Sequence, residues 1–250
     1  MVPVRKALLI ISGNDSESQI PAQRIRRFLL SPMGGGWRPS EITTLLNSSL
    51  TALTTSIEKM EADYSLTFFV GPTFADSANN KFLIVNETDY VQLNELISSS
   101  KRQLIVTDVI TQAAFMPIFS IGSEYERIVS RNLYSQWIER SPAGLVTVQA
   151  EPTHSPVDPG FLTQLLLSID SPLKELRQPI YKSILSAGID LNRSYKKMGL
   201  QPHITFQTQG NPALPFGLVL PFNNGSTYNK PAMSQTTFRK FFGLLFNNEI

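Results

Sequence analysis

The segment RQLIVTDVI, residues 102–110, decides the fold of this chain. Its apolar residues occur at odd and even positions alike: Leu104, Ile105, Val106, Val109 and Ile110. A strand with one face in water would alternate apolar and polar residues instead. The segment is therefore predicted to be a strand buried on both faces, as in the centre of a parallel sheet.

Asp108 is the only acidic residue of this segment and lies near its end. A buried carboxylate is costly unless it is paired, so Asp108 is either a satisfied structural group or part of a functional site. In open α/β sheets, ligands bind at the carboxyl ends of the strands. The loop that follows, TQAAFMPIF, is therefore a place where chemistry is expected.

Other apolar segments alternate with helical patterns along the chain. Strands are predicted at residues 6–12, 41–47, 65–71, 144–150 and 203–209, with short extended pieces at 81–87 and 215–221. Helices are predicted at about 20–31, 50–60, 89–99, 124–139, 161–169 and 174–198, and the fourth of these has an apolar stripe that includes Tyr125 and Ile128. This alternation predicts an α/β fold in three layers: a mainly parallel six-stranded sheet with helices on both faces.

The length and composition suit one such domain. With 250 residues, 42% of them hydrophobic and 17% charged, the chain is able to bury a large core. We expect a domain over residues 1–221 and a C-terminal tail over 222–250. The tail contains a short apolar segment, TFRKFFGLLF at 237–246, that suits a helix. This segment either packs back on the domain or docks on a partner.

Composition also limits the function. The net charge of +2 provides no basic face, so we expect no binding to nucleic acid. The absence of cysteine excludes disulfides and cysteine nucleophiles, and with His154 and His203 as the only histidines we expect neither a metal nor a cofactor. No apolar run reaches the roughly 20 residues of a membrane span, and no signal peptide is evident. We expect an intracellular, cytoplasmic protein.

Several short strings, in order, resemble the caspase, metacaspase and paracaspase superfamily. The opening KALLIIS with Gly13 and Asn14 resembles the family's first strand and turn. SLTFFVG at 65–71 is similar to the strand before the catalytic Ser-Gly-His-Gly, and RQLIVTDVI to the strand before the catalytic Asp-x-Cys. GLVTVQA at 144–150, FLT at 161–163, and QTQ and PFG at 207–209 and 215–217 agree with later parts of the family. The resemblance covers about residues 6–221 and implies a caspase-like fold.

The two catalytic positions of that family carry other residues here. Pro72 stands at the position of the histidine, and Ile110 stands at the position of the cysteine nucleophile. Neither side chain is able to donate, accept or carry a proton. The resemblance therefore implies a catalytically inactive caspase-like domain, a pseudopeptidase, that acts through protein–protein interaction as a regulator or scaffold.

The resemblance also implies where a partner binds. Members of the family pair by adding the edge strand of one sheet to another sheet. The strand from His203 to Gln209 is the predicted edge, so we expect a protein partner or a homodimer at this strand.

The alternative is an active peptidase or hydrolase with a relocated or engineered-out nucleophile. Thr73, Thr107 and Thr111 lie near the expected cleft, although threonine in or beside a strand is usually explained by its β-propensity. Asp108, Thr111 and His154 are the weak candidates for a substitute triad, because the loop that contains His154 opens at the same end of the sheet.

Two further alternatives stay open at this point. The string Gln112-Ala113-Ala114 echoes the family's Gln-Ala-Cys with alanine in the last place, as an engineered knockout would. A small molecule is also able to bind a cleft from which both catalytic side chains are missing. His203, at the start of its strand, is interpreted as structural.

Overall fold

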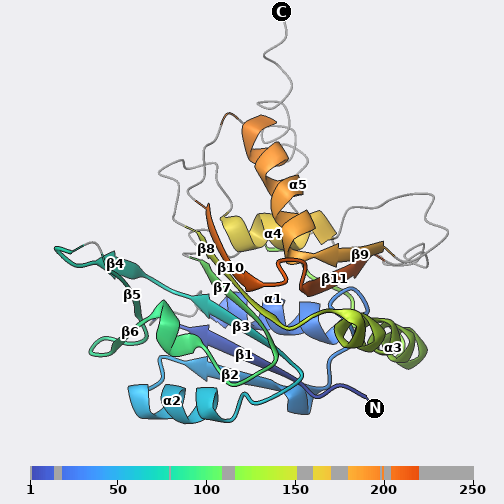
Figure 1. Cartoon of the computed structure of the whole chain (residues 1–250), viewed down its shortest axis with the longest axis horizontal. Coiled ribbons are helices and arrows are strands. Elements are labelled where there is room, and N and C mark those ends of the chain that lie inside the picture. Colours follow the sequence, from blue (N-terminus) through green and yellow to red (C-terminus); the bar gives the residue numbers. More distant parts are fainter. Residues whose placement is uncertain are drawn as a thin grey trace, which may run out of the picture.

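A six-stranded sheet forms the centre of the protein, whose structure is a computed structural model (Figure 1). It describes residues 2–13, 19–78, 80–108, 116–150, 160–169, 180–197, 199 and 204–219. The strand order is β10-β8-β7-β3-β1-β2. The strands are β1 (Arg5–Ile11), β2 (Ile42–Leu46), β3 (Tyr64–Val70), β7 (Arg102–Asp108), β8 (Gly144–Ala150) and β10 (Ile204–Gly210).

The sheet is parallel except at one edge. Neighbouring strands from β2 to β8 run parallel, whereas β10 is antiparallel to β8. All of β3 is buried, and in β7 only Arg102 is partly exposed. The prediction of a mainly parallel six-stranded sheet is confirmed, and so is the prediction that the segment beginning at Arg102 is a strand covered on both faces.

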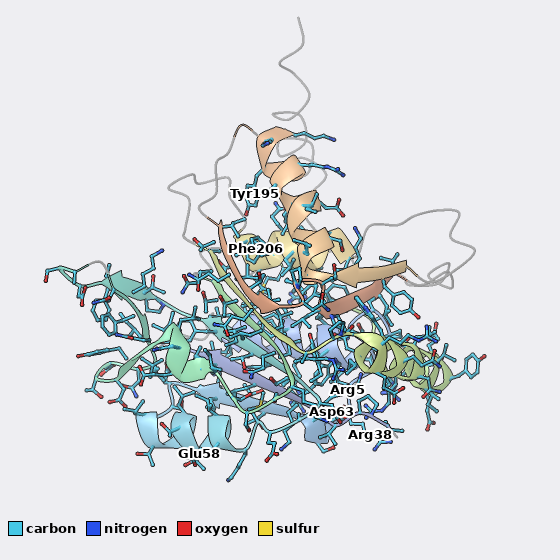
Figure 2. The ribbon with its side chains drawn as sticks, in the orientation of Figure 1. Arg5, Arg38, Glu58, Asp63, Tyr195 and Phe206 are labelled. Carbon is cyan, nitrogen blue, oxygen red and sulfur yellow. The ribbon has the colours of Figure 1, made fainter. Side chains whose placement is uncertain are left out.

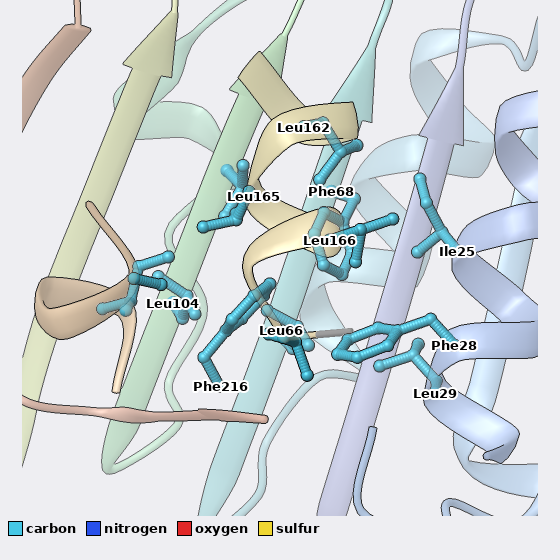
Figure 3. Packing of buried hydrophobic residues seen from close by; sticks show 14 of the residues in the cluster. Ile25, Phe28, Leu29, Leu66, Phe68, Leu104, Leu162, Leu165, Leu166 and Phe216 are labelled. Carbon is cyan, nitrogen blue, oxygen red and sulfur yellow. The ribbon is translucent and has the colours of Figure 1, made fainter. Parts of the chain in front are cut away.

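Four helices cover one face of the sheet: α1 (Gln19–Leu30), α3 (Glu124–Arg140), α4 (Phe161–Ile169) and α5 (Ile184–Lys197). A two-stranded sheet of β9 (Ile180–Ser183) and β11 (Pro215–Val219) lies with them. Figure 3 shows Leu162, Leu165 and Leu166 of α4 over β3 and β7. These leucines belong to the larger buried apolar cluster, which also includes Phe28 of α1 and Phe216 of β11.

The opposite face carries thinner cover. It consists of α2 (Leu50–Glu58), a small antiparallel sheet of β4 (Thr73–Ala75), β5 (Lys81–Ile84) and β6 (Tyr90–Gln92), and the single-turn helix η3 (Leu93–Leu96). A second buried cluster contains Leu53, Leu83 and Leu96 from this layer. They pack on residues of β1, β3 and β7: Leu8, Ile10, Phe69 and Ile105. The predicted three-layer architecture is confirmed.

Local sequence signals start several helices. Ser49 caps α2 by accepting the Ala52 N–H at 3.3 Å. Ser123 and Glu126 form a reciprocal capping box at the start of α3, and these contacts satisfy backbone donors that the first turn leaves unpaired. Among the helices of the described residues, none combines the length and the apolar character that crossing a membrane requires.

Three sequence predictions are corrected by the structure. Residues 89–99 do not form a helix, because Tyr90–Gln92 pairs with β5 and only one 3-10 turn follows. In the helical stretch predicted at 174–198, which the sequence interrupts near Pro179 and Gly188, the described residues from 180 on form β9 followed by α5. Tyr125 and Ile128 are 75% and 51% exposed, since α3 buries the face that contains Tyr134 and Ile138.

A buried arginine holds the start of β1 in place. Arg5 is 1% exposed, and its Nη1 donates to the Gly35 carbonyl at 3.0 Å. Its guanidinium lies 4.7 Å from the ring centre of Trp37, a cation–π contact. Glu41, in the short helix η2 (Pro39–Glu41), accepts from Arg5 at 3.3 Å and from Arg131 Nη1 at 2.8 Å. One carboxylate thus bridges two arginines, one from β1 and one from α3.

The charges of this cluster affect both pKa values. Burial lowers the pKa of Arg5 to about 10, although the charge of Glu41 opposes this shift. Burial raises the pKa of Glu41, but the hydrogen bond from Arg131 and the charge of Arg5 outweigh it and leave that pKa below its usual value. A carboxyl whose pKa is lower in the folded than in the unfolded state stabilises the protein at pH values above its unfolded-state pKa. This contribution of Glu41 is lost as the pH falls through its folded-state pKa.

Replacing Glu41 with glutamine is expected to destabilise the protein by about 3 kcal/mol at pH 7, because Arg5 stays buried without a counter-charge. Urea unfolding of the wild type and Glu41→Gln measures this difference. The difference is expected to shrink as the pH is lowered through the pKa of Glu41. Glu58→Gln is the matched control, since Glu58 is exposed on α2 (Figure 2) and its change should stay within about 0.5 kcal/mol. Equal stability of both variants at pH 7 would contradict the assigned role.

Candidate functional site

The carboxyl ends of β1, β3 and β7 lie side by side. Val70 is in register with Asp108, and the Gly71 N–H donates to the Asp108 carbonyl at 3.2 Å. The Ser12 N–H donates to the Val70 carbonyl at 2.8 Å. A Cβ on Gly71 would lie 2.7 Å from the Ser12 Cβ, so the chains approach here only because residue 71 is glycine. The segments after β3 and β7 therefore leave the sheet from one common edge.

Pro72 and Thr73 carry the chain from this edge into the small antiparallel sheet. Both residues are exposed. The Pro72 carbonyl accepts the Ile84 N–H at 3.0 Å. Thr73, the first residue of β4, pairs with Leu83 of β5. Pro72 thus lies at the start of the small antiparallel sheet, and its side chain has no ionisable group.

Asp108 is buried and its carboxylate caps the start of α4. Its side chain points to the face covered by α4, and its Oδ2 accepts the Leu162 N–H at 2.8 Å, while the residue is 3% exposed. Gly160, just before the helix, has φ +88° and lies so near that a Cβ would be 3.6 Å from this oxygen. A carboxylate at a helix N-terminus satisfies an unpaired donor and interacts favourably with the helix dipole. The structure shows Asp108 paired in this way, and a role of Asp108 in a functional site stays a prediction.

Thr107 does not join Asp108. Successive residues of a strand point to opposite faces of the sheet, so the Thr107 side chain lies on the face of Ile105 and the small antiparallel sheet. Thr107 is 3% exposed. The two side chains therefore face different layers and form no catalytic pair.

The other predicted site residues lie outside the described residues: Ile110, Thr111, His154 and His203. The parallel pairing of β7 with β8 does show that the loops containing Thr111 and His154 start at the same edge. A substitute triad of Asp108, Thr111 and His154 stays a prediction. Within the described ranges, no cluster of three His, Cys, Asp or Glu residues is arranged to hold a metal ion.

A second feature, on the face opposite α4, was not predicted from the sequence. A groove of about 600 Å³ has its floor on β8 and β10 and its wall on β5, β6 and η3. Its lining is rich in side-chain amides and hydroxyls: Asn80, Gln92, Asn94, Thr147, Gln149, Thr205, Gln207, Thr208 and Gln209. Lys81 is its single charged residue. The alternating polar residues of TFQTQ at 205–209 were the available signal, but the three segments meet only in the folded chain.

The chain matches none of the protein-family models, and no curated protein matches it. The geometry of the described residues therefore carries the functional argument.

Replacing Asp108 with alanine is expected to destabilise the protein by about 2 kcal/mol, because the Leu162 N–H would remain buried without an acceptor. Asp108→Asn keeps an acceptor oxygen and should lose less. Urea unfolding measures both variants, and amide exchange at Leu162 reports the cap directly. If the alanine variant is as stable as the wild type and the Leu162 amide stays protected, Asp108 does not cap α4.

Proposed function

We propose that this chain is a non-catalytic caspase-like domain that binds protein partners through the free edge of β10, as a regulator or scaffold. The observation that carries the proposal is an edge strand without protection against pairing. Within the described residues, β10 pairs with β8 alone and no strand covers its other side.

The edge of β10 lacks the features that usually prevent pairing. Proteins protect edge strands with lysine or other charges, proline, bulges or short length. Ile204–Gly210 contains no charged residue and no proline, and its register with β8 is continuous from Ile204 opposite Ala150 to Gly210 opposite Gly144. Most of its side chains are exposed. Such a strand is suited to accept another strand through main-chain hydrogen bonds.

The residues at and after the carboxyl ends of β3 and β7 support the non-catalytic part of the proposal. In the resemblance, the histidine and cysteine follow two strands that must end side by side, and β3 and β7 do so here. The residue aligned with the histidine is the exposed Pro72, and the residue aligned with the cysteine is Ile110. Asp108, the nearest buried acid, is already bound to the start of α4. These residues provide no described route for moving a proton to or from a nucleophile.

Introducing Gln207→Lys and Gln209→Lys together is expected to weaken association about tenfold or more, because two charges would face an added strand. Association of the full chain, with itself or with a captured partner, is measured by light scattering and by sedimentation. Thr43→Lys on β2, the opposite edge strand, is the matched control and should leave association unchanged. Equal weakening by the control, or none by the double variant, would argue against β10 as the binding edge.

The purified full chain is expected to leave a library of fluorogenic peptides uncleaved, because no thiol or imidazole occupies the two aligned positions. Hydrolysis that disappears in Asp108→Asn or His154→Ala would instead establish the alternative, a hydrolase with a relocated site. Hydrolysis that persists in both variants would indicate a contaminating peptidase.

A further inference from the structure

The groove on β8 and β10 lies directly beside the proposed binding edge. Residues 205, 207 and 209 face the groove from β10, which is the outermost strand of its floor. A strand added to the free edge of β10 would extend this floor, because neighbouring strands lie about 4.8 Å apart and their side chains alternate between the two faces. Every second side chain of a bound strand would therefore stand next to Thr205, Gln207 or Gln209.

The groove offers a charged side chain on the bound strand no opposite charge as a partner. Among its lining residues the only charge is that of Lys81, on the wall formed by β5, and Lys81 already has another interaction within the protein. Among the described residues, no carboxylate lines the groove. A charged side chain beside these residues would gain no opposite charge in the groove, whereas a neutral amide or hydroxyl would gain hydrogen bonds, so acidic and basic side chains are both disfavoured on this side.

The groove does offer hydrogen bonds to neutral polar groups. Gln207 on β10 is exposed and lies opposite Thr147 on β8. Thr147 is 5% exposed, and its hydroxyl oxygen has no hydrogen-bond partner within the part of the chain that the structure describes. Buried hydroxyls are nearly always hydrogen-bonded. An amide side chain on the bound strand would hydrogen-bond to the Gln207 amide, and Gln207 would hydrogen-bond to the Thr147 hydroxyl. The three side chains would form a hydrogen-bonded ladder across the bound strand, β10 and β8.

The other face of β10 has the opposite character. Ile204 and Phe206 are half-buried and pack against the larger apolar cluster. Figure 2 shows Phe206 near α5, where a Cβ on Gly188 would lie 2.5 Å from the Phe206 ring. The same helix exposes Leu185 and Ile189 at 39% and 47%. An added strand would extend this apolar layer with its remaining side chains.

We infer that the strand bound by β10 alternates neutral polar and apolar residues, with amides or hydroxyls over the groove and apolar side chains on the side of α5. This inference rests on the proposed function and specifies the chemistry of the partner. Lysine- or glutamate-rich strands are therefore expected to bind more weakly.

Four synthetic peptides of the length of β10 test this pattern. Each has valine at alternate positions and, between them, glutamine, glutamate, lysine or leucine, with neutral flexible ends and one fluorophore. Fluorescence anisotropy with the full-length protein should show the glutamine peptide bound at least ~10-fold more tightly than each of the other three. Equal affinity of the glutamine, glutamate and lysine peptides would overturn the inference while leaving the proposed edge intact. If none of the four binds, the proposed edge and the inference both fail.

A charge reversal locates the effect in the groove. Gln207→Glu should make the lysine peptide the tightest ligand, because its ammonium groups would then have a carboxylate beside them. Gln207 is exposed, so the variant should fold, and circular dichroism checks this. Thr43→Glu on β2 places the same charge on the other edge strand and should leave the ranking of the peptides unchanged. An unchanged ranking with Gln207→Glu would overturn the inference.

Discussion

The burial of β3 and β7 on both faces is the constraint on which the rest of the structure depends. Two strands that present apolar side chains on both faces require a layer above, a layer below and a paired strand on each side. The helices on one face and the small antiparallel sheet on the other meet this requirement. The same burial forces every polar group at the strand ends to find a partner, which is why Asp108 is bound to α4.

Sequence alone predicted the elements whose signals are local. Apolar residues at odd and even positions identified β1, β3 and β7, and α4 was predicted with its observed bounds. The failures occurred where pairing with distant residues outweighed local pattern. Tyr90–Gln92 carries a helical spacing but pairs with β5, and Ile180–Ser183 becomes a strand because β11, some thirty residues later, pairs with it.

In the candidate sites, too, local features were predictable from the sequence and contacts between distant residues were not. The sequence identified Asp108 as a carboxylate that must be satisfied, but its partner is the N–H of Leu162, 54 residues further along the chain. The opposite orientations of Thr107 and Asp108 follow from strand geometry once the strand is known. The groove could not be predicted, because residues near 80, 93, 147 and 207 meet only through the order of the strands.

Catalysis and strand pairing depend on different parts of such a fold, so the proposed loss of catalysis is compatible with the proposed pairing at β10. A catalytic dyad needs two particular side chains, and in the proposed function Pro72 and Ile110 take those two positions while β3 and β7 keep their pairing. Pairing at an edge uses main-chain groups, which any sequence retains unless it adds charge, proline or a bulge. β10 adds none of these along seven residues. The edge of β10, which no other strand of the described residues covers, is therefore the part of this sheet on which the proposed function depends.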